Sequence, residues 1–357
     1  GRPVGEREDH GSEENGRVMS GMEGITVALD AMGGDNAPAA TVVGALDARD
    51  ELGLEVLLVG DEPVLSDLLR KEGRGELSIV HAPERVEMGE EGAWAVRDRG
   101  DSSVVRAAEE VREGRAQAMV SAGNTGAAMA AAFFSWGRMK GIKRPAVAVV
   151  LPPAQAPKLL LDAGANADCT PENLLQFAFM GAVYAERVLG LPNPRVGLLN
   201  IGEEETKGNA LALAAYPLLA SSGLNFIGNV EGRDLHRGVA EVVVCDGFVG
   251  NVVLKVSEGL AALLFTQMKE AAATSVKGRL GGLLLRSSLR ALRNRLDYTE
   301  YGGAPLLGVD GVSIIAHGRS NARAIRNAIR VAAKAAEEGV VEVIRRAMAS
   351  SLGGKSQ

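Results

Sequence analysis

Six short turns in the sequence combine glycine with side-chain amides, hydroxyls and carboxylates, the groups that can bind or position a small anion. Each turn follows a short apolar run that is typical of a buried strand. In open α/β sheets the ligand crevice lies beyond the carboxyl ends of the strands, and backbone amides at the following helix starts favour anions. We therefore expect the turns to share one large anion-binding cleft. They begin at Asp30, Ser121, Asp162, Asn200, Gly228 and Asp246.

The residues expected to line this cleft have three kinds of role. Lys207 opens a helix after the fourth turn and is the best-placed cation for phosphate, with Asn229 and Asp162 as further catalytic candidates. Asn124, Asn166 and Asn229 are candidate donors to a substrate carbonyl oxygen. The candidates for phosphate or substrate binding are Gly33, Gly34, Asp35, Asn36, Ser121, Gly123, Asn124, Thr125, Gly164, Asn166, Asn200, Gly202, Glu204, Gly228, Glu231, Asp246, Gly247, Gly250, Asn251 and His317.

Signatures of other chemistry are missing from the sequence. The G-x-x-x-x-G-K-[ST] and G-x-S-x-G patterns are absent, and no G-x-G-x-x-G follows the first strand. Cys245 ends an apolar run, which favours a buried structural thiol. Cys169 precedes a helix start, where a thiol pKa can be lowered. Asp30, Asp162 and Asp246 could bind Mg²⁺ but more simply cap helices, so we expect neither a metal nor a cofactor.

A cleft rich in anion-binding groups and poor in nucleophiles suits a reaction in which the anion itself attacks. Inorganic phosphate is partly dianionic near neutral pH. A thioester releases a thiolate of modest basicity, because a thiol pKa is about 8.5. Such a reaction needs a positioned phosphate and a stabilised oxyanion more than a strong base.

The composition is that of an ordinary globular enzyme. Of the 357 residues 46% are hydrophobic and 24% are charged, so the chain can bury a sizeable core. Two cysteines exclude a disulfide scaffold and suggest a reducing compartment. The net charge of −6 argues against a general nucleic-acid binder. The 45 glycines indicate many tight turns or close approaches of the backbone to a ligand.

Strand-like runs alternate with helical stretches, which predicts a doubly wound α/β fold with a mostly parallel sheet in three α/β/α layers. We expect two lobes, the first over 22–150 and 305–350 and the second over 151–304. The proline-rich 151–157 marks the crossing, and the acidic, apolar-poor 1–21 is expected to be a disordered tail. Expected strands are 25–30, 56–60, 78–80, 118–121, 146–151, 158–162, 195–200, 225–228, 242–245 and 312–316, and expected helices are 37–49, 64–71, 102–113, 125–136, 171–189, 207–221, 250–273 and 321–349.

Two segments raise the question of membrane contact. Residues 116–137 carry no charge and are long enough to span a bilayer, but a turn within them would leave backbone groups unsatisfied in lipid. We expect a strand, a turn and a helix there instead. Residues 277–296 carry six positive charges and leucines at helical spacing, which predicts a basic amphipathic helix. It could contact an anionic membrane or a partner subunit through Leu285, Arg286, Leu289, Arg290, Leu292 and Arg293.

Longer motifs resemble those of the bacterial phosphate acyltransferases, which are acyl-ACP:phosphate transacylases of phospholipid synthesis. The segment VALDAMGGDNAP at 27–38 is similar to the N-terminal signature of this family. The resemblance extends from about residue 24 to residue 349. Further matching motifs lie at 121–126, 162–166, 176–181, 194–209, 226–234, 245–251, 301–308 and 316–318.

The resemblance implies transfer of an acyl chain from acyl carrier protein to inorganic phosphate, giving an acyl phosphate for the membrane enzyme that acylates glycerol 3-phosphate. It also implies a fold like that of phosphotransacetylase and isopropylmalate dehydrogenase, and a cytoplasmic homodimer that associates peripherally with the membrane. Two alternatives stay open: a phosphotransacetylase-type enzyme that uses acyl-CoA, and a non-catalytic scaffold at the membrane. Acyl carrier protein is strongly acidic, so its docking needs a local basic surface, for which Arg286, Arg290 and Arg293 are candidates.

Overall fold

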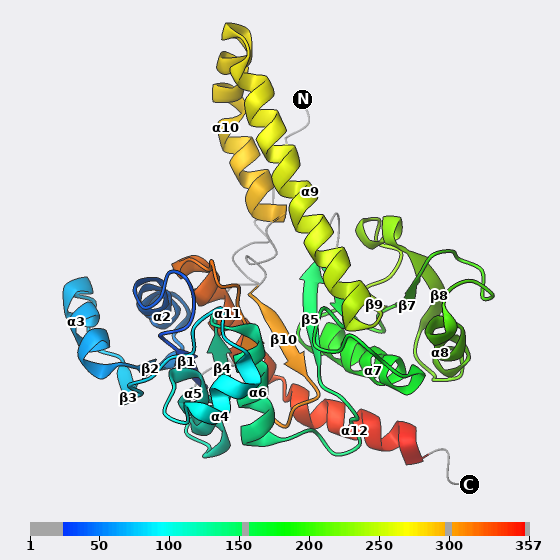
Figure 1. Ribbon diagram of the computed structural model, residues 1–357, viewed down its shortest axis with the longest axis horizontal. Helices are drawn as coiled ribbons and strands as arrows, with labels where there is room; N and C mark the ends of the chain where they lie inside the picture. Colours follow the sequence, from blue (N-terminus) through cyan, green and yellow to red (C-terminus); the bar gives the residue numbers. More distant parts are fainter. Residues whose placement is uncertain (1–23, 152–156, 297–301, 354–357) are drawn as a thin grey trace, which may run out of the picture.

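The computed structural model describes residues 24–151, 157–296 and 302–353. Within these ranges eleven strands form one sheet and helices cover both faces, which confirms the predicted three-layer fold class (Figure 1). The predicted tail at 1–21 lies outside the described residues. The strands are β1 (Thr26–Asp30), β2 (Glu55–Gly60), β3 (Ser78–His81), β4 (Ala118–Ser121), β5 (Ala146–Leu151), β6 (Lys158–Leu161), β7 (Val196–Asn200), β8 (Phe226–Glu231), β9 (Val242–Val244), β10 (Ala304–Leu307) and β11 (Val312–Ile315).

The helices alternate with the strands along most of the chain. Several of them end at a glycine with positive φ, such as Gly53 after the first described helix. They are α2 (Ala39–Leu52), α3 (Glu62–Glu72), α4 (Gly92–Asp98), α5 (Ser103–Arg112), α6 (Thr125–Trp136), α7 (Pro171–Arg187), α8 (Ala210–Ala220), the short 3-10 helix η1 (Gly232–His236), α9 (Gly247–Ala273), α10 (Val276–Leu296), α11 (Ala322–Glu337) and α12 (Val340–Gly353).

The sheet reverses direction near its middle. The strand order is β3-β2-β1-β4-β11-β10-β5-β6-β9-β7-β8. β10 is antiparallel to both β11 and β5, and β5 is antiparallel to β6. On one side of these pairings, β3, β2, β1, β4 and β11 are parallel to one another. On the other side, β6, β9, β7 and β8 are parallel to one another. The carboxyl ends of β1, β4 and β11 therefore lie at the opposite edge of the sheet from those of β6, β7, β8 and β9.

The alternation of side chains along each strand explains the layers. In β1, Val27 and Leu29 face a cluster formed with α2 and α11, whereas Ala28 faces the cluster of α5 and α6. The central strands β4, β5, β6 and β9 are buried along their whole length, as strands covered on both faces must be. In the second half of the sheet, α7, α8 and α12 cover one face, and the start of α9 covers the other.

The main differences from the predicted elements have local causes. The helix predicted over 321–349 is two helices, because Gly339 adopts a φ of +58° directly after α11. Two elements were not predicted because they are too short to show a clear period. β10 has four residues, including Pro305, and α4 has seven. The uncharged 116–137 forms β4, a turn and α6, as predicted.

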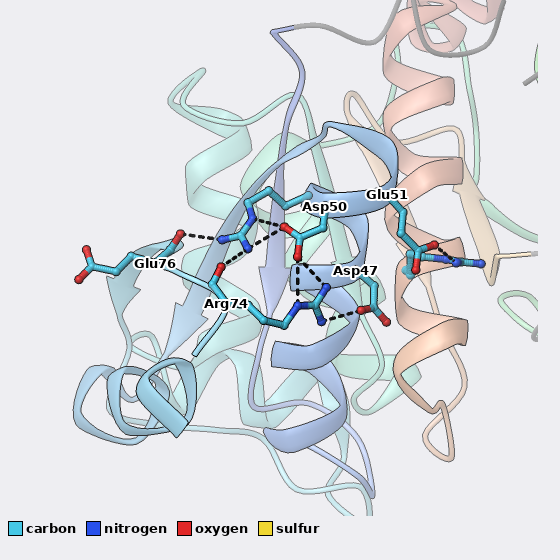
Figure 2. A network of polar contacts seen from close by, with 7 residues as sticks. Asp47, Asp50, Glu51, Arg74 and Glu76 are labelled. Atoms are coloured by element: carbon cyan, nitrogen blue, oxygen red, sulfur yellow. Dashed lines mark hydrogen bonds and ion pairs between the residues drawn. The ribbon is translucent and has the colours of Figure 1, made fainter. Parts of the chain in front are cut away.

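A network of ion pairs ties α2 to the chain that leaves α3 (Figure 2). The Arg74 guanidinium contacts Asp47 and Asp50 of α2, both at 2.7 Å. Arg49 pairs with Asp50 at 2.7 Å and donates to the carbonyl oxygen of Glu76 at 3.0 Å. The hydrogen bonds from Arg49 and Arg74 lower the pKa of Asp50. Because the groups are partly exposed, we assign the network a modest structural role.

Helices α9 and α10 pack on each other and form an arm that projects from the body of the molecule (Figure 1). The predicted basic helix at 277–296 is therefore present as α10. Many leucines on the arm are exposed, for example Leu283 at 64% and Leu284 at 74%. Among the described residues, α9 is the one helix whose length and composition would allow it to cross a membrane.

Candidate active site

The glycine- and asparagine-rich turns form two groups, and the expectation that they share one cleft is wrong. The reversal at β10, β5 and β6 places them at opposite edges of the sheet. We call these the first-lobe edge, after β1, β4 and β11, and the second-lobe edge, after β6, β7, β8 and β9. The first-lobe edge carries Gly33, Gly34, Asp35, Asn36, Ser121, Gly123, Asn124, Thr125 and His317, and the second-lobe edge carries Asp162, Gly164, Asn166, Asn200, Gly202, Glu204, Lys207, Glu231, Asp246, Gly247, Gly250 and Asn251. The turn predicted to begin at Gly228 is wrong, because Gly228 and Asn229 lie within β8, which continues to Glu231.

At the first-lobe edge a buried carboxylate holds two turns together. Asp30 is 2% exposed, and its two oxygens accept hydrogen bonds from the hydroxyls of Ser103 and Ser121, each at 2.6 Å. Burial raises the pKa of Asp30 although these bonds oppose the shift. A Cβ on Gly33 would lie 2.4 Å from Asp30 Oδ2 and 2.8 Å from the nitrogen of Gly123. The close approach of the two turns at Gly33 therefore needs glycine. Ser103, a hydrogen-bond partner of Asp30, was not among the predicted site residues.

The amides of this edge serve the fold. Asn124 Nδ2 donates to three carbonyl oxygens of the 87–90 segment at 2.7 to 3.3 Å, while its Oδ1 caps α6. Asn36 Nδ2 donates to the carbonyl oxygens of Arg319 and Ser320, both at 3.1 Å. Asn124 was predicted to donate to a substrate carbonyl. Its N–H groups are already used by the protein, so the geometry favours a structural role.

At the second-lobe edge, Asp162 organises the turn after β6. Its Oδ1 accepts the backbone N–H groups of Val147, Gly164 and Ala165 at 3.0 to 3.1 Å. Its Oδ2 accepts the backbone and side-chain N–H groups of Asn166, both at 2.8 Å. The residue is 0% exposed, and burial raises its pKa against the effect of these bonds. A fully buried carboxylate does not reach substrate, so we assign Asp162 to positioning rather than to the predicted catalytic role.

The other polar groups of this turn are equally occupied. Asn166 Nδ2 donates to the Pro145 carbonyl oxygen at 2.7 Å as well as to Asp162, which leaves neither N–H for a substrate. Burial and then the charge of Asp162 raise the pKa of Cys169 to about 11. Cys245 is buried, and burial raises its pKa well above the usual value. Both thiols are therefore protonated near neutral pH and are poor nucleophiles.

The loop after β7 presents Lys207. Asn200 Nδ2 donates to the Lys207 carbonyl oxygen at 3.0 Å, and Asn229 Nδ2 donates to the Glu204 carbonyl oxygen at 2.8 Å. Asn229 is 7% exposed and supports the loop from the sheet, so its geometry also favours positioning over the predicted catalytic contact. A Cβ on Gly202 would lie 3.0 Å from Lys207 Cγ, so the lysine stem passes closely over this glycine. The loop thus fixes the base of an exposed lysine side chain.

The Lys207 ammonium is not paired with any of the charged side chains that the structure describes around this loop. Within the described part of the chain the Lys207 ammonium has no hydrogen bond or ion pair. Arg233, a cation that the sequence reading did not select, pairs with Glu231 at 2.9 Å and with Glu203 at 3.7 Å. An anion that reaches this edge would therefore meet Lys207 without displacing a carboxylate partner.

Helix α9 starts at the same edge and contacts the Asp162 turn closely. A Cβ on Gly250 would lie 1.8 Å from the Asp162 carbonyl oxygen, and a Cβ on Gly247 would lie 2.7 Å from that of Asn166. Only glycine permits these contacts. The Asp246 carboxylate caps the helix by accepting a backbone N–H of the first turn at 2.9 Å. The first turn of α9 is thereby fixed on the turn after β6.

Asn251 lies in this first turn and differs from the three asparagines predicted as donors. Its side chain is exposed beside Gly164, where an added Cβ would lie 3.7 Å from Asn251 Oδ1. Its amide has no hydrogen bond within the described ranges. The second-lobe edge therefore exposes a cation without an ion pair within the described residues, Lys207, and an amide without a hydrogen bond there, Asn251, while the exposed Arg233 is held by Glu231.

Comparison with known proteins identifies the family of the chain. A family model described as a fatty acid synthesis protein matches residues 25–343. A phosphate acyltransferase from Pelotomaculum thermopropionicum is 55% identical over 327 residues, which cover 91% of this chain and 96% of the relative. The phosphate acyltransferase of Heliobacterium modesticaldum is also 55% identical, over 90% of this chain and 97% of its own. The chain belongs to the phosphate acyltransferase family.

Solved structures agree with this acyltransferase at the level of the fold. A phosphotransacetylase from Streptococcus pyogenes is similar with a TM-score of 0.63 at 16% identity, over 91% of this chain and 98% of that chain. A branched-chain phosphotransacylase from Enterococcus faecalis has a TM-score of 0.55 at 17% identity, over 87% and 99% of the two chains. The predicted phosphotransacetylase-like fold is confirmed. Membership of an enzyme family also removes the non-catalytic scaffold from the alternatives.

Proposed function

We propose that this phosphate acyltransferase moves a long-chain acyl group from acyl carrier protein to inorganic phosphate and so supplies acyl phosphate for phospholipid synthesis. The observation that carries the proposal is the unpaired Lys207 ammonium at the second-lobe edge, an edge that also exposes the Asn251 amide next to Gly164. A phosphate oxygen attacks the thioester carbon, the C–S bond breaks, and the thiolate leaves and takes a proton from solvent. The acyl group thus passes directly to phosphate, without a covalent bond to the protein.

Two residues have roles in this step. The Lys207 ammonium binds and orients the phosphate dianion, which is already nucleophilic at neutral pH. The Asn251 amide donates to the thioester oxygen, on which negative charge develops during attack. A cysteine nucleophile is not supported, because burial keeps the thiols of Cys169 and Cys245 protonated. This division of labour lets phosphate supply the chemistry while the protein supplies position and charge.

The donor is tested by comparing acyl carriers. Release of free acyl carrier protein from palmitoyl-ACP should depend on phosphate and should yield one acyl phosphate per turnover. Acetyl-CoA and palmitoyl-CoA, assayed in parallel, represent the phosphotransacetylase-type alternative. A preference for palmitoyl-ACP supports the proposal. Faster turnover of acetyl-CoA would favour the alternative, and radioactive acyl label retained on the protein would overturn direct transfer.

We also propose that α10 supplies the basic surface for the acidic carrier protein. Arg286 and Arg290 are exposed on α10 and have no resolved ion pair within the described residues, whereas the Arg293 side chain lies outside them. Opposite charges on two partners mainly raise the association rate. Arg286→Glu with Arg290→Glu should raise the KM for palmitoyl-ACP and leave the KM for palmitoyl-pantetheine unchanged. Equal effects on both donors would remove these arginines from carrier docking.

The same arm supports a proposal for the assembly and location of the protein. We propose a homodimer that contacts anionic membranes peripherally from the cytoplasm, because α9 and α10 together leave a broad apolar surface uncovered. Leu285 is 55% exposed and Leu292 is 44% exposed, while Leu289 is partly covered. Such apolar area next to arginines suits an anionic lipid surface. The first turn of α9 is fixed against the sheet, which supports peripheral contact over spanning.

Two measurements separate the membrane from the dimer. Leu289→Glu with Leu292→Glu should abolish sedimentation with phosphatidylglycerol vesicles and leave turnover in solution nearly intact. Sedimentation equilibrium reports the oligomeric state of the same variant. Unchanged vesicle binding together with dissociation to monomers would assign these leucines to the subunit interface instead. A monomer at all concentrations of the unaltered protein would contradict the homodimer.

A further inference from the structure

A basic loop, residues 138–144, joins α6 to β5. Its sequence is RMKGIKR, and the chain has no acidic residue between Glu113 and Asp162. The four cationic side chains of the loop are exposed, whereas its two large apolar side chains, Met139 and Ile142, are buried. The loop therefore presents its charges to solvent and packs its apolar side chains into the core.

The basic loop is held in one position by hydrogen bonds on two sides. The Met139 backbone N–H donates to the Gly308 carbonyl oxygen at 3.0 Å. The buried Gln176 of α7 accepts the Lys143 backbone N–H at 2.8 Å and donates to the Gly141 carbonyl oxygen at 2.8 Å. A surface that is ordered before binding loses less conformational entropy when a ligand binds.

Most of the charge of the basic loop is not neutralised. Lys143 pairs with Glu172 of α7 at 3.5 Å. Within the described ranges the other three cations have no ion pair: Arg138, Lys140 and Arg144. An anion from outside the chain would therefore meet these cations without displacing a carboxylate.

The basic loop ends beside the second-lobe edge. Asn166, in the turn after β6, donates from Nδ2 to the Pro145 carbonyl oxygen at 2.7 Å, and its own carbonyl oxygen accepts the first backbone N–H of α9 at 2.8 Å. Arg144 reaches the same turn and donates to the Asp168 carbonyl oxygen at 3.4 Å. Arg144 and Asn251, which lies in the first turn of α9, are therefore both neighbours of the turn after β6.

We propose that the basic loop binds the phosphate ester in the carrier arm of the acyl donor. The inference rests on the proposed function, because it takes the thioester carbon to lie at Asn251. In a thioester of acyl carrier protein or of coenzyme A, the sulfur ends a pantetheine arm whose other end is a phosphate ester. From Asn251 this arm extends over the turn after β6 to Arg144 and Lys140, which bind the phosphate ester. The inorganic phosphate that attacks stays with Lys207.

The chemistry of the basic loop fits a phosphate ester better than a lipid surface. A guanidinium can donate two parallel hydrogen bonds to one phosphate group, and an ammonium adds a point charge. A membrane-binding segment pairs its cations with exposed apolar side chains. The basic loop exposes none, because Met139 and Ile142 are buried.

Two donors that differ by one phosphate test the basic loop. They are palmitoyl-pantetheine and palmitoyl-phosphopantetheine, which both avoid any effect on docking of the carrier protein. Lys140→Gln with Arg144→Gln should raise the KM for the phosphorylated donor about ten-fold or more and leave the KM for palmitoyl-pantetheine within about two-fold. Arg70→Gln with Lys71→Gln, on the exposed face of α3, is the matched control and should change neither KM. Equal effects on the two donors, or no effect on either, would overturn the proposal.

Protection from acetylation tests the same site without turnover. Phosphopantetheine should slow the acetylation of Lys140 by an N-hydroxysuccinimide ester, measured by mass spectrometry, whereas pantetheine should not. Equal protection by inorganic phosphate would assign the basic loop to the attacking anion and overturn the proposal. Loss of sedimentation with phosphatidylglycerol vesicles in the Lys140/Arg144 variant would assign it to the membrane and do the same. If no donor shows phosphate-dependent turnover, the proposed function fails, and the protection of Lys140 still decides on the basic loop.

Discussion

Asn229 holds the loop that carries Lys207. The buried Asn229 side-chain amide donates to the Glu204 carbonyl oxygen at 2.8 Å, and the Lys207 backbone N–H donates to the same oxygen at 3.1 Å. One backbone oxygen therefore connects β8 to the turn that presents the ammonium group. The position of the cation depends on a neighbouring strand, although the two residues are far apart in the sequence.

Asn229→Ala removes this connection. The Glu204 carbonyl oxygen loses one of its two donors and keeps the Lys207 N–H, so we expect the free energy of unfolding to fall by about 0.5 to 1.5 kcal/mol. The KM for phosphate should rise about ten-fold, because Lys207 is no longer held in place. Asn225→Ala is the control. Asn225 directly precedes β8, and its Nδ2 makes a similar hydrogen bond, to the Asn193 carbonyl oxygen at 3.0 Å, that does not involve the Lys207 loop. A variant that loses stability but keeps its KM for phosphate would contradict the positioning role.

Asn251→Ala removes the exposed amide at the start of α9. We expect kcat to fall by a factor of roughly 10² to 10³, which is typical for the loss of one oxyanion donor. Stability should change little, because the side chain makes no hydrogen bond within the described residues. Steady-state kinetics at saturating phosphate measures the effect, and Asn251→Gln is the matched conservative variant. Full activity of the alanine variant would exclude the residue as a donor to the thioester oxygen.

The docking of α9 depends on Gly250. An alanine there would bring its Cβ to 1.8 Å from the Asp162 carbonyl oxygen, so Gly250→Ala should displace the helix start and lower both stability and kcat. Gly259→Ala, in the same helix, meets nothing within 4 Å and should stabilise the protein by about 0.5 to 1 kcal/mol. Urea unfolding compares the two variants. Equal stability of both would show that the close packing at Gly250 is unimportant.

The reactivity of Cys169 should follow its raised pKa. Burial and the charge of Asp162 raise the pKa of Cys169 to about 11, so the thiol form dominates below that pH. Alkylation by iodoacetamide should therefore be slow at pH 7 and should accelerate about ten-fold per pH unit toward pH 10. In denaturant the same residue should titrate near its ordinary value of about 8.5. Rapid alkylation of the folded protein at pH 7 would reveal a thiolate and reopen the case for a cysteine nucleophile.

The sequence predicted the elements better than their arrangement. Continuous apolar runs such as 118–121 and 146–151 located buried strands with the correct ends, because burial on both faces leaves a clear local signal. The direction of a strand has no such signal. β10 is only four residues long and contains Pro305, so it gave no strand signal. Its antiparallel pairings with β11 and β5, together with the antiparallel pairing of β5 with β6, nevertheless place the turns at two opposite edges of the sheet.

The site was predicted in part for a related reason. Lys207 is exposed and unpaired, as a phosphate ligand must be. Asn124 and Asn166 looked like substrate donors because residue type alone does not show which groups the fold itself uses. Asn251 was predicted to bind substrate, and it stays available because its amide has no hydrogen bond within the described residues, whereas the unpredicted Arg233 is held by Glu231 at 2.9 Å. The residue type shows that a side chain could contact substrate. The tertiary hydrogen bonds decide whether its polar atoms are still unpaired.

The central claim is that Lys207 holds the attacking phosphate at the second-lobe edge, and the phosphate dependence of turnover tests it most directly. Initial rates are measured with palmitoyl-ACP over a wide range of phosphate for the unaltered protein, Lys207→Ala and Lys207→Arg. We predict that kcat/KM for phosphate falls at least 100-fold in Lys207→Ala and recovers partly in Lys207→Arg, while the KM for palmitoyl-ACP stays constant. An alanine variant with unchanged kcat/KM at low phosphate would contradict the account.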